Sequence, residues 1–195
     1  MNSQYEMQFS FTTREEILYW EQRYIEDQSE ERKELEQTVI GFKQNVESRV
    51  SCETPNGYLL QTELSEMGQW KHGALPYWMD KNPPGHVEEI TAEAFRLSDD
   101  WEKLIKLTEI KKGVRQSVAS VILHLYDEGD YPILDHHALR SVWIREKYVR
   151  GPRYPFWQEY VDLCREKAEH YGVSMRTLDR ALWKYSESGN AEKHR

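Results

Sequence analysis

Asp135 is the residue whose type and position most directly suggest chemistry. It follows the apolar, proline-containing segment 131–134 and precedes a helical pattern that starts with His136 and His137. An aspartate in this position is most often a helix N-cap, because its carboxylate accepts backbone N–H groups of the first turn. A carboxylate fixed in this way also stabilises a positive charge that develops beside it, and it can orient or deprotonate an attacking water. We therefore predict that Asp135 caps a helix, a position that is compatible with a catalytic role.

A glycine turn with flanking cations lies upstream of Asp135. Gly113 stands between a charged segment and an apolar helical pattern, and it is surrounded by Lys111, Lys112 and Arg115. Backbone N–H groups at such a turn and at the next helix N-terminus can hold a phosphate, and glycine lets the backbone come close. The alternative is an ordinary helix–helix turn with a C-capping glycine. The turn alone favours this alternative, whereas its combination with Asp135 favours a phosphate-binding hairpin.

Segment 111–140 resembles the core of the helix-hairpin-helix DNA glycosylase superfamily, which includes endonuclease III, the adenine glycosylase MutY and 8-oxoguanine glycosylases. The hairpin of that superfamily is approximately L-P-G-V-G-x-K-T-A, followed after an apolar helix by V-D-T-H-x-x-R. The Asp, His and Arg of the second element correspond to Asp135, His137 and Arg140, and the resemblance implies that Asp135 is the catalytic carboxylate. Segment 64–186 also resembles an uncharacterised bacterial branch, which we expect to carry Arg where this chain has His137.

Ser117 occupies the position of the lysine that bifunctional glycosylases carry in the hairpin, 18 positions before Asp135. That lysine forms a Schiff base with the sugar, which a serine hydroxyl cannot do. The resemblance therefore implies a monofunctional glycosylase in which water attacks and an abasic site remains, unless Lys111 or Lys112 replaces the lysine. It also implies double-stranded DNA with a flipped-out base as partner, no organic cofactor and at most a monovalent cation at the hairpin.

Charge is distributed unevenly along the chain, whose net charge is −8. Residues 1–100 carry 9 Lys and Arg against 20 Asp and Glu, a net −11, whereas residues 101–195 carry 17 against 14, a net +3. The C-terminal half can therefore present a nucleic-acid surface, with a solvated face of mixed charge as an equal alternative. The residues expected to contact DNA are Lys111, Lys112, Gly113, Arg115, Ser117, Arg140, Arg145 and Arg150.

Loop 72–85 combines aromatic, proline and glycine residues over an unusual length. Long loops inside compact domains are commonly functional or disordered. We expect this loop to form an adaptable wall around a base larger than uracil, either a damaged base in DNA repair or a modified cytosine in phage DNA. The expected base-pocket residues are Gln69, Trp70, Tyr77, Trp78 and Asn82. The alternative is that these aromatic side chains close the core beneath the loop.

Composition excludes several other classes. Cys52 and Cys164 are too few for a disulfide framework or a four-cysteine iron–sulfur cluster, and they favour a reducing, cytoplasmic setting. No apolar run approaches the roughly 18 residues of a membrane span, and the N-terminus lacks the pattern of a signal peptide. A zinc site at His136 and His137 is not expected, because adjacent helical side chains diverge by about 100°. Two other functions stay open: a non-catalytic nucleic-acid-binding module, and a protein-interaction factor with an acidic N-terminal half.

The periodicity predicts an all-α fold. We expect an N-terminal helical segment over 1–60, a glycosylase-like body over 61–187 and a polar tail over 188–195, in a monomer. Thr13 and Glu16 form a capping-box pattern. Expected N-caps of later helices are Thr62, Ser98 and Ser174, and the central helix carries a stripe that should bury one face. The members of that stripe are Val118, Val121, Ile122 and Leu125.

Overall fold

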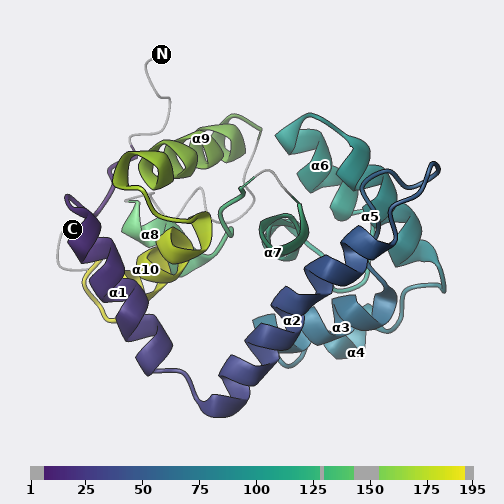
Figure 1. The fold of residues 1–195 in the computed structure, drawn as a ribbon, viewed down its shortest axis with the longest axis horizontal. Helices are drawn as coiled ribbons and strands as arrows, with labels where there is room; N and C mark the ends of the chain where they lie inside the picture. Colours follow the sequence, from purple (N-terminus) through teal and green to yellow (C-terminus); the bar gives the residue numbers. More distant parts are fainter. Residues whose placement is uncertain (1–6, 128–129, 143–153, 192–195) are drawn as a thin grey trace. The chain divides into compact units, whose positions relative to one another are not determined.

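The computed structural model describes residues 7–127, 130–142 and 154–191 (Figure 1). Within them the chain forms helices and no strand, so the predicted all-α class is confirmed. The helices are α1 Arg14–Glu26, α2 Glu30–Ser48, α3 Gln61–Lys71, α4 Pro76–Met79, α5 His86–Arg96, α6 Asp100–Leu107, α7 Gln116–Tyr126, α8 His136–Ser141, α9 Tyr154–Tyr171 and α10 Met175–Glu187.

The helices belong to two compact units. The first consists of Met1–Gln28 and Gly129–Arg195, and the second of Ser29–Glu128. This grouping divides the predicted N-terminal segment 1–60, because α1 packs on α10 whereas α2 packs on α3 and α7. The order of helices along the chain does not reveal this division, since it depends on which apolar faces meet.

The predicted N-caps Thr13 and Ser174 are confirmed, each with a partner N–H three residues later. The Glu16 N–H donates to Thr13 Oγ1 at 3.2 Å, and Ser174 accepts from the N–H of Thr177 at 3.0 Å. Two other predicted caps, Thr62 and Ser98, are wrong. At α3 the Leu60 N–H donates to the Glu63 side chain, and at α6 the cap is Asp99, whose carboxylate is longer than a serine hydroxyl and accepts two N–H groups.

α7 forms the core of the second unit. The predicted stripe is buried, but Ala119, Ser120 and Leu123 between its members are buried as well. The helix is therefore enclosed on most of its circumference rather than on one face. Its last residue, Tyr126, donates its hydroxyl to the Val39 carbonyl of α2 at 3.1 Å, which satisfies the polar end of a buried ring.

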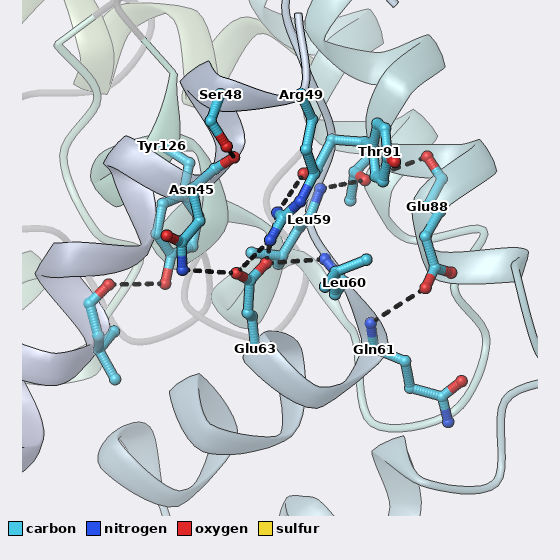
Figure 2. Close-up of polar contacts among 12 residues, drawn as sticks. Asn45, Ser48, Arg49, Leu59, Leu60, Gln61, Glu63, Glu88, Thr91 and Tyr126 are labelled. Carbon is cyan, nitrogen blue, oxygen red and sulfur yellow. Dashed lines mark hydrogen bonds and ion pairs between the residues drawn. The ribbon is translucent and has the colours of Figure 1, made fainter.

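A partly buried ion pair joins the end of α2 to the start of α3 (Figure 2). Arg49 donates to both carboxylate oxygens of Glu63, with N···O distances of 2.8 and 2.6 Å. Asn45 Nδ2 and the Leu60 N–H donate to the same carboxylate. Burial alone would raise the pKa of Glu63, but Arg49 and these donors outweigh it and hold the pKa below its usual range. The pair thereby holds the end of α2 against the start of α3.

In the first unit, extended segment 131–134 is held by two helices. The Ile133 N–H donates to the buried Asp179 carboxylate of α10 at 3.3 Å, and its carbonyl accepts from the Tyr160 hydroxyl of α9 at 3.2 Å. Both backbone groups of Ile133 are therefore satisfied without a neighbouring strand. This anchoring sets where the following residue, Asp135, enters α8.

Candidate functional site

The Gly113 turn predicted from the sequence joins α6 to α7 in the second unit. Gly113 has φ of 82°, the left-handed conformation that glycine adopts without strain. Lys111, Lys112 and Arg115 are exposed around it, and no ion pair links any of the three to another described residue. The turn thus presents three cations beside the N-terminus of α7, whose first N–H groups also favour an anion.

The close approach of α4 explains why residue 113 must be glycine. A Cβ atom added at Gly113 would lie 2.7 Å from Met79 Cγ, and one added at Gly68 would lie 2.4 Å from Met79 Sδ. The Met79 side chain is fully buried between these two glycines. Loop 72–85 is therefore packed against the hairpin within one unit.

Asn82 bonds to the hairpin backbone through both ends of its amide. Its Oδ1 accepts from the Lys112 N–H at 3.2 Å, and its Nδ2 donates to the Lys112 carbonyl at 3.0 Å. Nδ2 also donates to the Met79 carbonyl at 2.8 Å. The Asn82 amide is buried and bonded to these backbone groups, so its role within the fold is to hold the turn, and its contact with a base stays a prediction.

Trp70, also predicted to line the base pocket, is buried in the second unit. Its side chain is 4% exposed, and the Arg32 guanidinium of α2 lies 5.6 Å from its ring centroid. Trp70 is therefore a core residue of the second unit, which was the alternative weighed for the aromatic side chains. Gln69, one position earlier on α3, is exposed.

Tyr77 and Trp78 lie on the surface of α4, with exposures of 65% and 49%. Their ring centroids are 5.1 Å apart at an interplanar angle of 80°. The Lys81 ammonium lies 3.6 Å from the Tyr77 centroid and 4.6 Å from the Trp78 centroid. Lys81 was not among the predicted site residues. It follows the two rings by three and four positions, the spacing that brings side chains together in a helical turn.

Asp135 is the N-cap of α8, as predicted. Its Oδ1 accepts from the His137 N–H at 2.9 Å, and the side chain remains 16% exposed. His136 Nδ1 lies 3.6 Å from the same oxygen, and the pair is ionic only when the imidazole is protonated. The carboxylate is consequently held in one orientation at a partly open position, with a titratable ring beside it.

His137 turns from Asp135 towards α10. Its ring packs edge-on against Trp183 at 5.3 Å, and Nδ1 lies 3.4 Å from Ser186 Oγ. Burial, together with the neighbouring His136, lowers the pKa of His137 below its usual value. The two imidazole centroids are 3.9 Å apart, closer than the predicted divergence suggests. Among the described residues, no group of three His, Cys, Asp or Glu side chains is arranged to hold a metal ion.

The remaining residues predicted to contact DNA lie on α7, on α8 or outside the described residues. Ser117 is in the first turn of α7, and Arg140 is half-buried on α8. Arg145 and Arg150 lie outside the described residues. The hairpin belongs to the second unit and Asp135 to the first.

In comparisons with known proteins, the chain matches no family model, no curated protein and no solved structure. Within the part of the chain that the structure describes, no helix is both long enough and apolar enough to cross a membrane.

Proposed function

We propose that this protein is a monofunctional DNA glycosylase with a helix-hairpin-helix core. The observation that carries the proposal is the hairpin: a left-handed Gly113 turn, anchored by Asn82, with three exposed cations beside the N-terminus of α7. An anchored backbone turn with surrounding positive charge suits a phosphate of the DNA backbone, which positions the protein without selecting a sequence. The polar pairing of Asn82 supports this role because it holds the turn in shape before DNA arrives.

Asp135 supplies the carboxylate that the proposed reaction requires. As the C1′–N bond breaks, its electron pair leaves with the base and positive charge develops on the deoxyribose. A carboxylate fixed by the His137 N–H stabilises that charge and orients the water whose oxygen bonds to C1′. The proton lost by water balances the charge on the departing base, and an abasic site remains.

Ser117 makes the proposed reaction monofunctional. Its hydroxyl cannot form the imine through which a lysine would nick the strand. The expected product is an intact strand with an abasic site, cut only after alkali. Borohydride should trap no covalent protein–DNA adduct, and an adduct would assign lyase activity to Lys111 or Lys112 instead.

The test is incubation with DNA duplexes that carry a panel of damaged bases and modified cytosines, followed by alkaline cleavage of abasic sites. Asp135→Asn keeps an oxygen for the His137 N–H but removes the charge, so excision should fall at least about 100-fold with little change in stability. Asp99→Asn is the matched control, because Asp99 is also an N-cap but belongs to α6. Undiminished excision by a folded Asp135→Asn variant would remove Asp135 from the mechanism.

A non-catalytic nucleic-acid-binding module is the second candidate. The exposed hairpin cations and the exposed pair Tyr77 and Trp78 all lie in the second unit, without Asp135. That unit alone carries the features expected of a binding surface. Salt-dependent DNA binding without excision from any substrate of the panel would favour this candidate over the glycosylase.

A further inference from the structure

Tyr77, Trp78 and Lys81 form an exposed cluster, here called the α4 cluster, that the core does not explain. α4 is held to the second unit by the fully buried Met79, whereas Tyr77 and Trp78 leave most or half of their side chains in water. Isolated exposed apolar residues are ordinary in proteins, but two adjacent large aromatic rings with a cation over both are not needed for packing. The exposure of the two rings therefore indicates a binding surface.

The residues next to the α4 cluster in the chain contact the hairpin. Asn82 follows Lys81 directly and bonds to both backbone groups of Lys112, while Met79 contacts the position of Gly113. These contacts tie α4 to the hairpin turn at two adjacent points. A ligand that binds the hairpin can thus reach the α4 cluster without any rearrangement between the units.

The charge of this surface identifies the kind of partner. Lys81, Lys111, Lys112 and Arg115 are exposed, against the exposed acidic residues Asp80 and Glu109, of which Glu109 is paired with Lys106. The whole chain, in contrast, has a net charge of −8. A local excess of cations on an acidic protein attracts a polyanion, and exposed aromatic faces add stacking partners for unpaired bases.

We propose that the α4 cluster stacks an unpaired nucleotide of single-stranded DNA whose neighbouring phosphates bind the hairpin cations. Rings accept any base by stacking, so the contact is independent of sequence. Lys81 Nζ lies over a face of each ring, so an incoming base displaces the ammonium, which then pairs with the phosphate of the stacked nucleotide. Intact duplex keeps its bases paired and cannot use the rings. The protein should therefore bind single strands and unpaired bubbles more tightly than duplex of the same sequence. This inference shares with the proposed function only the binding of DNA at the hairpin.

The experiment measures equilibrium binding of the full chain to one sequence as single strand, bubble and duplex. Tyr77→Ala combined with Trp78→Ala should weaken binding of the single strand roughly 10- to 100-fold, while binding of the duplex changes little. Phenylalanine at both positions keeps the rings and should restore most of the affinity. Tyr19→Ala is the control, because Tyr19 is 57% exposed on α1 and should leave all three affinities unchanged. Wild-type affinity of the double alanine variant for the single strand would overturn the proposal.

A second measurement needs no variant. Single-stranded DNA with 5-bromouracil should cross-link on irradiation to the tryptic peptide of residues 72–81, which cleavage after Lys71 and after Lys81 releases and which contains both rings. Cross-links confined to other peptides would overturn the stacking site. The Asp135→Asn variant separates the two proposals, because it should lose excision but keep single-strand binding. Ring-dependent binding without excision refutes only the glycosylase, and Asp135-dependent excision with ring-independent binding refutes only the α4 cluster.

Discussion

The amide of Asn82 pairs with both backbone groups of Lys112, 30 positions later in the chain. Such a pairing gives the hairpin a partner that resembles a short piece of backbone, and it satisfies groups that would otherwise compete for water. It also ties the segment that follows α4 to the backbone of the hairpin. The shape of the hairpin therefore depends on Asn82, a buried residue outside it.

Replacing Asn82 tests this dependence. Asn82→Ala leaves the Lys112 N–H and carbonyl without their partner, so the free energy of unfolding should fall by about 1–3 kcal/mol. DNA affinity through the hairpin should fall as well, because the turn is no longer held. Gln69→Ala, at an exposed position of α3, should change stability by less than about 0.5 kcal/mol. Denaturant titration and DNA binding provide the two measurements, and equal stability of the two variants would contradict the anchoring role.

Gly113→Ala should destabilise the fold through backbone strain and through a clash with Met79. Gly85→Ala should show the strain alone. Gly85 has a similar φ of 76° but no atom within 4 Å of an added Cβ, whereas Gly113 would meet Met79 Cγ at 2.7 Å. Gly85→Ala should therefore cost only the backbone strain, about 1–2 kcal/mol. Gly113→Ala should cost roughly 1–3 kcal/mol more, because Met79 must move. Thermal unfolding of both variants measures the difference, which should vanish if the α4 contact is absent in solution.

The hairpin lysines should determine how strongly salt weakens DNA binding. Lys111→Ala with Lys112→Ala removes two expected phosphate contacts, so the slope of log K against log salt should flatten by about 1.8 for duplex. Lys33→Ala with Lys43→Ala removes the same charge from α2 and should leave the slope nearly unchanged. Binding isotherms at four or five salt concentrations give both slopes. A flattening common to the two pairs would indicate a general charge effect and not a hairpin contact.

Stability should decrease in mild acid because of His137. Its pKa in the folded chain lies below the ordinary value of 6.5, since burial and the neighbouring His136 disfavour the imidazolium. The unfolded chain therefore binds more protons in this range, and the contribution to stability is complete above pH 6.5 and is lost as the pH falls through the folded pKa. Asp135 and Glu187 oppose the shift, and Arg140 adds to it.

His137→Gln should remove much of this pH dependence while retaining a polar side chain towards Ser186. Denaturation midpoints between pH 5 and 8 test the expectation, with His72→Gln as control because His72 is exposed on the loop after α3. The same acid loss in wild type and His137→Gln would assign the effect to another group.

The sequence by itself determined the features that depend on near neighbours. Periodicity was sufficient for the all-α class, and the caps at Thr13, Asp135 and Ser174 follow from a side chain and a backbone N–H two or three positions away. Likewise, Gly113 could be recognised as a turn residue, because its left-handed conformation is a local property of the backbone.

Tertiary structure decided everything that depends on which distant groups meet. Asn82 was predicted to contact a base, and only the fold shows its amide bonded to Lys112. Trp70, Tyr77 and Trp78 were all predicted to line the base pocket. In the fold, Trp70 is buried beside Arg32 of α2, whereas the rings of Tyr77 and Trp78 remain exposed. The division of segment 1–60 arose in the same way. Burial and pairing are decided by the sum of many weak contacts across the chain, and no short stretch of sequence contains that sum.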